Sequence, residues 1–311
     1  MFFRALKRVA LADGAFKDKE RALLEAAAAF YTVPIDLDQL GPVTVDEVAQ
    51  GIASPEARER LLQAALLVAL ADGEASPSEW EVLDELRVAL EVDNDNLKVF
   101  YELSLGHFRA ARAEILRRTH AAELKDRYAA EGWLGVFDFM QDGHSAAPPE
   151  EATQADDQSL WRHRKLGLLP SGTLGRQTWQ YCVENELAFV GETRGPKDDT
   201  RDFVCVVLGL GAGARDQLTL AGFLAGNTGE DPFGQLFLAL LQFHAGVKVT
   251  PGAAPAKGLF SPSHVMAAVA AGKLITTDLL REWTPWDDVE QPVVAIRERL
   301  GLAPQGLSLP S

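Results

Sequence analysis

The tetrapeptide Leu-Ala-Asp-Gly occurs twice in this chain, at Leu11–Gly14 and at Leu70–Gly73, with an offset of 72 − 13 = 59 residues. A glutamate follows each glycine by six residues, Glu20 in the first copy and Glu79 in the second. Each copy predicts a helix, an Asp-Gly turn and a second helix, because glycine tolerates the positive φ that ends a helix. Apolar residues at helical spacing follow both turns, at Leu23, Leu24, Ala27, Phe30 and Tyr31, and at Val82, Leu83, Leu86, Ala89 and Leu90.

The second copy carries a helix start signal, Ser76-Pro77-Ser78-Glu79, which is a capping box with proline at the first helical position. Asp13 and Asp72 occupy related positions and form a possible acidic cation site, if they approach each other across the duplication. The favoured interpretation is that both aspartates bond turn amides. A calcium EF-hand is excluded, because a loop with Gly73 at position 6 would place Val68 and Leu70 at ligand positions.

These two segments, LADGAFKDKERALL and ALADGEASPSEWEVLDEL, resemble the TerB-like family, which is named for bacterial tellurite-resistance proteins. The resemblance lies within residues 1–92. It implies an all-helical bundle built from a duplicated hairpin. It also implies a stress-linked or partner-binding role, with cation binding by acidic residues as a further option.

The length of 311 residues favours two domains. The polar segment Gln141 to Gln158 contains Pro148-Pro149 and is typical of a linker. We therefore expect an all-α protein with a TerB-like helical domain at 1–140, a linker at 141–158 and a second helical domain at 159–311. Apolar spacing predicts further helices between residues 94 and 140.

The formal net charge of −15 disfavours general binding to nucleic acid, although acidity also serves solubility. Two cysteines, Cys182 and Cys205, are too few for a disulfide framework and favour a reducing compartment. No apolar run reaches the length of a membrane span, and the basic, apolar start fits a first helix better than a targeting segment. We expect a cytoplasmic protein, with peripheral contact to a membrane as an option.

Arg201, Asp202, Cys205 and Gln217 have the spacing of a metal site but not its chemistry. On a helix, residues 201 and 205 lie one turn apart on the same face, with 202 beside them. Arginine has no lone pair for a metal, and glutamine supplies no charge. We therefore treat these four residues as candidates for a ligand site and expect no bound metal.

Residues 159–304 resemble the ubiquinone-biosynthesis family called Coq-four. The match rests on Leu168 to Arg176 followed by Trp179, on Thr200 to Asn227, and on a tail with Trp283, Arg297, Leu300, Gly301 and Pro304. The resemblance implies an all-α domain linked to scaffolds for quinone biosynthesis, prenyl-lipid binding and oxidative decarboxylation of the quinone ring. The family signature is His-Asp-x-x-His, eleven residues and Glu, and it binds a divalent cation, with zinc favoured.

In this chain the signature positions hold Arg201, Asp202, Cys205 and Gln217, so the spacing is kept while three ligand types are replaced. Asp202 and Cys205 alone are too few ligands for zinc. His163, His244 and His264 could complete a set, but none has ligand spacing to 201–205. Arg201 could instead bind an anionic head group, such as a phosphate or carboxylate.

Three other features have a structural and a functional interpretation. Cys205 beside Arg201 could be a nucleophile, but no histidine base lies near it in sequence, and a partly buried cysteine is favoured. Leu208 to Gly213 could be a phosphate loop after a strand, but a loop between helices is favoured. The apolar stretch Pro232 to Val249 favours a buried helix over a hydrocarbon pocket or a membrane-surface helix.

The sequence therefore predicts a non-catalytic or metal-independent binding or scaffold protein of the Coq-four type, acting on an isoprenoid or quinone-like lipid or on partner proteins. We assign no catalytic residue and no cofactor. Two alternatives stay open: a quinone-pathway enzyme with a rebuilt metal site, and a TerB-like stress-response adaptor.

Overall fold

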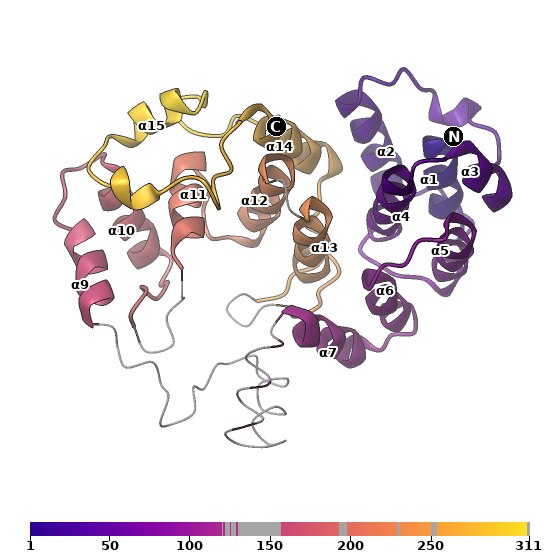
Figure 1. Ribbon diagram of the computed structural model, residues 1–311, viewed down its shortest axis with the longest axis horizontal. Helices are drawn as coiled ribbons and strands as arrows, with labels where there is room; N and C mark the ends of the chain where they lie inside the picture. Colours follow the sequence, from indigo (N-terminus) through magenta and orange to yellow (C-terminus); the bar gives the residue numbers. More distant parts are fainter. Residues whose placement is uncertain are drawn as a thin grey trace. The chain divides into compact units, whose positions relative to one another are not determined.

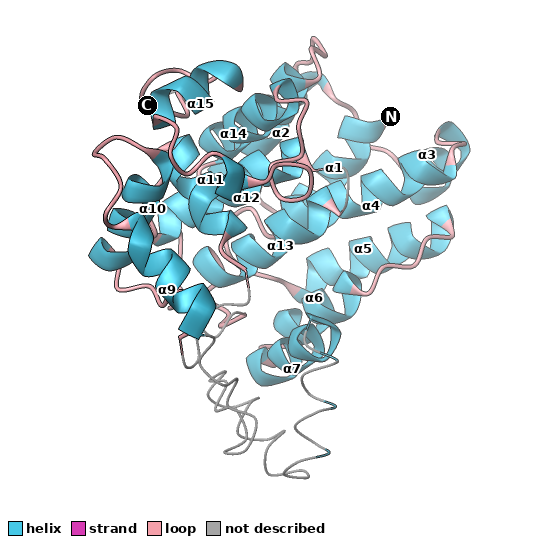
Figure 2. Cartoon of the chain, turned by 60° about the vertical axis from the view of Figure 1, so that its left-hand side comes forward, coloured by secondary structure: helices cyan, strands magenta, loops and turns pink. Residues whose placement is uncertain are grey.

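The computed structural model describes residues 1–119, 157–192, 198–228, 231–249 and 254–309, with single positions at 121, 125 and 129. Every regular element within these residues is a helix, and none of them forms a β-strand (Figure 2). The expectation of an all-α fold is confirmed. The expected linker at 141–158 lies outside the described residues up to position 156.

Contacts divide the chain into two compact units. The first comprises residues 1–123 and 236–266, and the second comprises 124–235 and 267–311. The second stretch of the first unit therefore comes from within the region expected to form the C-terminal domain. A domain boundary at the 141–158 linker stays a prediction.

The first unit contains the duplicated hairpin, whose two copies are the helix pairs α1/α2 and α4/α5 (Figure 1). Helix α1 packs against α2, α3, α4 and α5, and α6 packs against α5 and α7. The elements are α1 (Phe2–Ala10), α2 (Asp18–Phe30), η1 (Leu37–Gln39), α3 (Val45–Gly51), α4 (Pro55–Ala69), α5 (Pro77–Leu90), α6 (Asn96–Ser104) and α7 (Phe108–Thr119).

The two Asp-Gly turns have the same local geometry. Gly14 and Gly73 adopt φ of 93° and 94°, a region that favours glycine. In each turn the aspartate Oδ1 accepts a hydrogen bond from the backbone N–H two residues later, at 3.2 Å in the first copy and 2.9 Å in the second. Asp13 and Asp72 therefore do bond turn amides, as the favoured interpretation states.

Helix α5 starts with the predicted capping box. Ser76 N–H and Oγ–H donate to Glu79 Oε2, both at 2.8 Å, and Glu79 N–H donates back to Ser76 Oγ at 3.1 Å. In the first copy Lys17 N–H donates to Glu20 Oε2 at 2.9 Å. In both hairpins a glutamate carboxylate thus accepts a hydrogen bond from a backbone N–H at the start of the second helix, which has no partner within the helix.

The first unit also includes the chain from Leu236 to Met266, which packs on the second Asp-Gly turn. His244 Nε2 lies 2.9 Å from the Ala71 carbonyl oxygen, and Phe260 N–H donates to His244 Nδ1 at 3.2 Å. A Cβ at Gly73 would lie 3.2 Å from His244 Nε2, so glycine also leaves room for the ring. His244 therefore has a structural role at this turn.

The second unit is a second set of helices (Figure 1). Its described residues form two apolar clusters. Helix α10 packs against α9 and α11, and α11 packs against α15. The elements are α9 (Asp157–Leu166), α10 (Leu174–Glu184), α11 (Thr200–Leu208), α12 (Ala214–Asn227), η2 (Pro285–Asp287) and α15 (Val293–Arg299). Helix α13 (Pro232–Phe243) begins in this unit and continues into the first, and α14 (Pro262–Leu274) begins in the first and continues into this one.

Helix α11 covers the Val204–Leu208 segment that the phosphate-loop alternative required as a strand, so that alternative fails. Gly209, at φ 72°, ends the helix in a left-handed conformation. The buried Arg297 guanidinium donates to the carbonyl oxygens of Val206 and Val207, both at 2.8 Å. Arg297, from the C-terminal tail, therefore provides hydrogen-bond donors for carbonyl groups at the C-terminal end of α11, the helix that carries Arg201, Asp202 and Cys205.

Helix α13 is largely buried, which agrees with the favoured interpretation of the apolar stretch from Pro232 to Val249. The buried hydrophobic residues on it are Phe233, Leu236, Phe237, Ala239, Leu240, Leu241 and Phe243. Among the described residues, no helix combines the length and the apolar character that a membrane span requires.

Candidate functional site

The first unit gathers the charged residues of both hairpins around one lysine. Lys17 Nζ forms ion pairs with the carboxylates of Asp13, at 2.6 Å, and of Asp72. The two sequence-predicted aspartates are thus joined by a side chain that the sequence analysis did not single out. We call Asp13, Lys17, Glu20, Asp72 and Glu79 the acidic hairpin cluster.

Electrostatics couple the members of this cluster. Burial disfavours the charged ammonium of Lys17, but its hydrogen bonds to Asp13 and Asp72 outweigh burial and raise its pKa. The hydrogen bond from Lys17 lowers the pKa of Asp13. The ammonium therefore remains charged at neutral pH and serves as a counter-ion built into the fold.

Glu20 and Glu79 are the buried acids of the cluster, at 0% and 2% exposure. In each, Oε2 accepts the capping-box hydrogen bonds, while the buried Oε1 has no hydrogen-bond partner. Burial, with a smaller contribution from the nearby charge of Asp72, raises the pKa of both carboxyl groups to about 7. Both residues therefore change charge near neutral pH.

The sequence offered one signal for these glutamates, their equal distance of six residues from the two Asp-Gly turns. It offered no signal that both would be buried, since a glutamate at the third helical position is normally exposed to solvent. Lys17 was missed because the second copy has Ser76 at the equivalent position, 76 − 17 = 59 residues later.

The second unit brings together the four residues of the candidate ligand site. Arg201 Nη2 donates to Gln217 Oε1 at 3.3 Å, which joins α11 to α12. Cys205 is buried, at 1% exposure, and its thiol interacts with the side chains of Tyr181 and Gln217. Asp202 Oδ2 lies 4.0 Å from Cys182 Sγ on α10. The structure therefore places Arg201, Asp202, Cys205 and Gln217 in one neighbourhood.

Burial shifts the titration of the thiols and of the acid in this neighbourhood toward their neutral forms. Burial raises the pKa of Cys182 to about 12 and also raises the pKa of Cys205 above its usual range. Burial raises the pKa of Asp202 to about 6, and the charge of Asp199 adds to the shift. Neither cysteine carries the thiolate that a nucleophile or a zinc ligand needs.

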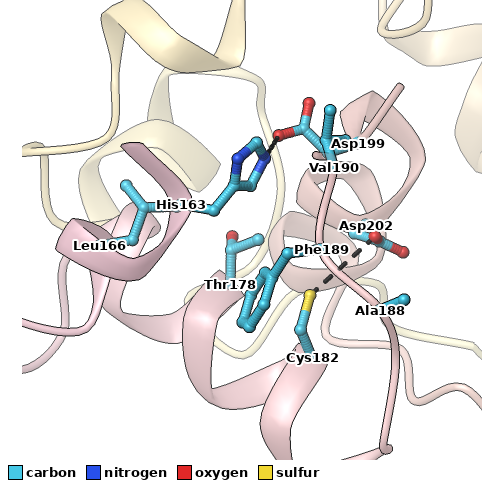
Figure 3. A pocket seen from close by; sticks show the side chains of 9 residues that line it. All are labelled: His163, Leu166, Thr178, Cys182, Ala188, Phe189, Val190, Asp199 and Asp202. Atoms are coloured by element: carbon cyan, nitrogen blue, oxygen red, sulfur yellow. Dashed lines mark hydrogen bonds and ion pairs between the residues drawn. The ribbon is translucent and has the colours of Figure 1, made fainter. Parts of the chain in front are cut away.

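A small pocket lies beside Asp202, between α9, α10 and the start of α11 (Figure 3). Its volume of about 10 Å³ corresponds to the space that a single water molecule needs. His163 and Asp199 form one wall, and Cys182 and Phe189 face them (Figure 3). The pocket is too small for an isoprenoid chain, so a lipid would have to bind elsewhere or open the site.

His163 does not act as a free base in this pocket. Nε2 contacts the Asp199 carboxylate and Nδ1 lies 2.7 Å from the Ser159 carbonyl oxygen. Burial disfavours the charged ring, but these two acceptors outweigh burial and raise the pKa of His163. Each ring nitrogen therefore lies against a hydrogen-bond acceptor, which favours the imidazolium form and leaves neither nitrogen free to accept a proton or bind a metal.

His163 has no ligand spacing to residues 201–205 in the sequence. The fold brings it next to Asp202 across the pocket but directs both ring nitrogens to other partners. His244 is likewise occupied in the first unit. Among the described residues, no three His, Cys, Asp or Glu side chains form a group that could hold a metal ion.

The comparison with known families identifies part of the first unit. Residues 43–99 match the family model of the tellurite resistance protein TerB. This segment runs from the chain before α3 into α6 and includes Asp72, Ser76 and Glu79 of the second hairpin. No curated protein and no solved structure matches the chain. The N-terminal resemblance is thereby supported, whereas no match supports the resemblance of the C-terminal half to the Coq-four family.

Proposed function

We propose that this protein is a non-catalytic, metal-independent binding adaptor whose TerB-like first unit provides the functional surface. The observation that carries the proposal is the Lys17 ammonium between the Asp13 and Asp72 carboxylates. A lysine in that position supplies internally the positive charge that a bound cation would supply. The match of residues 43–99 to the TerB family model supports the same class of protein.

The state of the polar side chains in the second unit supports a binding role over catalysis. Cys182 and Cys205 favour the neutral thiol, and His163 has hydrogen-bond acceptors on both ring nitrogens. Nucleophilic catalysis requires an activated nucleophile and a base within reach of it. The described residues around Asp202 offer neither.

A serine at position 17 tests the role of the lysine, because Ser76 is the natural residue of the second copy. We expect the wild-type protein to purify without a bound divalent metal and to show no thermal shift with Mg²⁺, Ca²⁺ or Zn²⁺. Lys17→Ser leaves Asp13 and Asp72 without their counter-ion, so one of these cations should raise its melting temperature. Arg21→Ser, which removes an exposed ion pair with Asp38, is the matched control.

Elemental analysis of the purified wild-type protein decides the metal question. About one tightly bound metal per chain would overturn the metal-independent proposal. Partner binding is tested by affinity purification of the full chain and of a chain that lacks residues 1–140, a deletion that removes the first unit except for its second stretch, residues 236–266. Loss of partners on deletion supports the adaptor role of the first unit, and retention of all partners would contradict it.

A second candidate function is the Coq-four type of scaffold, which binds an isoprenoid or quinone-like lipid or its partner enzymes. One observation favours it: Arg201 is exposed, and among the described residues its guanidinium donates a hydrogen bond only to the neutral amide of Gln217. A guanidinium with spare donors suits an anionic phosphate or carboxylate head group. Native mass spectrometry of the purified protein should then show a co-purified lipid that Arg201→Ala loses, and an unchanged lipid content would count against this candidate.

A further inference from the structure

Helix α9 in the second unit presents a basic and aromatic face on an otherwise acidic protein. The chain carries 45 acidic and 30 basic residues. The ten residues of α9, however, include one acidic residue, Asp157, and the three basic residues Arg162, Arg164 and Lys165. All three basic residues are exposed.

Arg162, Arg164 and Lys165 form no ion pairs with the described part of the chain, unlike His163 on the same helix, which pairs with Asp199. Lys165 instead lies over the ring of Trp161, with Nζ 3.3 Å from the ring centroid. Arg162 lies over the ring of Trp286, with Cζ 3.8 Å from the ring centroid. Cation–π contacts hold these side chains in place without neutralising their charge. The positive charge of the face therefore remains available for an anionic partner.

Two large apolar side chains extend the same face. Trp161 is 59% exposed, and Leu168, in the turn just after the helix, is 84% exposed. Positions 161, 164 and 165 follow the three- and four-residue spacing of one surface of α9. The Leu168 N–H donates to the Lys165 carbonyl oxygen at 2.9 Å, which continues this spacing into the turn after the helix. Apolar and basic groups thus occur together, which is typical of segments that bind at a membrane interface.

Contacts on the buried side of α9 and at the turn after it fix the orientation of this face. His163 and Leu166 point inward, where the His163 imidazolium pairs with Asp199 and Leu166 joins an apolar cluster. At the turn, Arg176 donates a hydrogen bond to the Gly167 carbonyl oxygen. A Cβ at Gly167 would lie 2.8 Å from the Trp179 ring, so only glycine lets that ring pack there. Leu168 is therefore presented by an ordered turn.

We propose that the face formed by Trp161, Arg164, Lys165 and Leu168 docks the protein on an anionic lipid bilayer. The basic side chains would meet the lipid phosphates, while Trp161 and Leu168 would enter the interface between head groups and acyl chains. A nucleic acid would satisfy the charges but offers no apolar layer for Leu168. This surface differs from both candidate centres, and the proposal is independent of the metal-free adaptor function.

The attraction is local, which reconciles it with the net charge of −15. At physiological ionic strength, charges on solvent-exposed surfaces are screened over about 8 Å. The bilayer therefore responds to the residues that face it and much less to acidic side chains elsewhere.

The test is co-sedimentation of the full-length protein with vesicles of phosphatidylcholine, alone or mixed with phosphatidylglycerol. We expect binding only to the mixed vesicles and a loss of binding at high salt. Arg164→Gln combined with Lys165→Gln should weaken binding about 25-fold, since each basic residue near an anionic surface contributes roughly fivefold. Arg215→Gln, which removes an exposed arginine on α12, is the matched control and should bind as the wild type does.

A label at position 168 separates a bilayer from other anionic partners. Because Cys182 and Cys205 are buried, a thiol-reactive fluorophore will label Leu168→Cys selectively in the folded protein. Its emission should shift to the blue with mixed vesicles, as expected for a probe in the interface. The same label at Leu274→Cys is the control, because Leu274 is 83% exposed on α14 and lies outside the face.

Three results would overturn the proposal. They are equal binding to both kinds of vesicle, unchanged binding of the Arg164→Gln/Lys165→Gln variant, and a label at position 168 that responds to RNA or to polyglutamate but not to vesicles. Circular dichroism of each variant confirms that it is folded before its binding is compared.

Discussion

Glu20 and Glu79 occupy equivalent positions in the two hairpins, 79 − 20 = 59 residues apart, and each buries one carboxylate oxygen without a hydrogen-bond partner. Burial of a carboxylate without a partner costs free energy unless the group takes up a proton. The pKa of both groups is accordingly raised to about 7. The duplication has therefore placed two proton-binding groups in the core of the first unit.

The first prediction is that the free energy of unfolding falls as pH rises from about 5 to 8. Both glutamates have a raised pKa, so between 4.5 and 7 the folded protein binds more protons than the unfolded chain. The stabilisation is fully present below 4.5 and is lost as pH rises through 7. Each group contributes at most about 3 kcal/mol to this loss. Urea unfolding at a series of pH values measures it.

Glutamine at position 79 tests this assignment, because it keeps the capping acceptor and removes the titrating proton. We expect the free energy of unfolding of Glu79→Gln to equal that of the wild type near pH 4.5 and to exceed it at pH 8. Glu47→Gln is the control: Glu47 caps α3 through the same type of capping box but is exposed and has a lowered pKa. A Glu79→Gln profile parallel to that of the wild type would disprove the assignment.

The hairpins show which part of the fold the sequence could predict. The Asp-Gly turns and the Ser76 capping box are local signals, set by the backbone freedom of glycine and by amides near in sequence. The inclusion of residues 236–266 in the first unit depends instead on contacts such as that of His244 with the Ala71 carbonyl, 173 residues away. No local pattern encodes a contact of that kind.

The second prediction concerns the buried pair of His163 and Asp199. Asp199→Asn keeps the acceptor for the Trp286 indole N–H but leaves the imidazolium without its counter-charge. Loss of one partner of a buried ion pair costs about 3 kcal/mol. Because the pKa of His163 is raised, the cost should be largest below pH 6.5 and should shrink as pH rises through the folded-state pKa.

Urea unfolding at pH 6 and at pH 9 measures this difference. The neighbouring substitution Asp198→Asn is the matched control, since the exposed Asp198 accepts from Thr200 and asparagine can do the same. An equal loss of stability in both variants, or no loss in Asp199→Asn, would refute the role of the pair.

The third prediction is that both cysteines react slowly in the folded protein. Cys182 and Cys205 are 4% and 1% exposed, and burial raises the pKa of both thiols. Labelling with a thiol-reactive disulfide reagent at pH 8 should therefore be limited by opening of the structure, and both thiols should react at once in urea. A cysteine that reacts stoichiometrically within the mixing time would instead indicate an activated nucleophile.

The candidate site was predictable in its spacing and not in its surroundings. The helix that joins Arg201, Asp202 and Cys205 follows from sequence. The approach of Cys182 to Asp202, and of Tyr181 to Cys205, depends on the packing of α10 against α11. Burial at this packed interface raises the pKa of both thiols, so the chemistry of the site is set by tertiary contacts.

The fourth prediction is that Gly272→Ala destabilises the second unit, although alanine favours a helix more than glycine does. A Cβ at Gly272 would lie 2.0 Å from the Phe223 carbonyl oxygen, and a Cβ at Gly226 would lie 2.0 Å from that of Val269. The two glycines thus let α12 and α14 pack with their backbones in contact. The added methyl group must push the helices apart, at a cost of roughly 1–3 kcal/mol.

Thermal and urea unfolding of Gly272→Ala measures this cost. Gly41→Ala is the control, because a Cβ at Gly41 would meet no atom within 4 Å. Phe223 and Leu224 on α12 belong to the same apolar cluster as Ala268 on α14, so separation of the helices also opens that cluster. We therefore expect an increase in the binding of a hydrophobic dye by Gly272→Ala at temperatures below its unfolding transition. A variant as stable as the wild type would show that the helices can separate without cost.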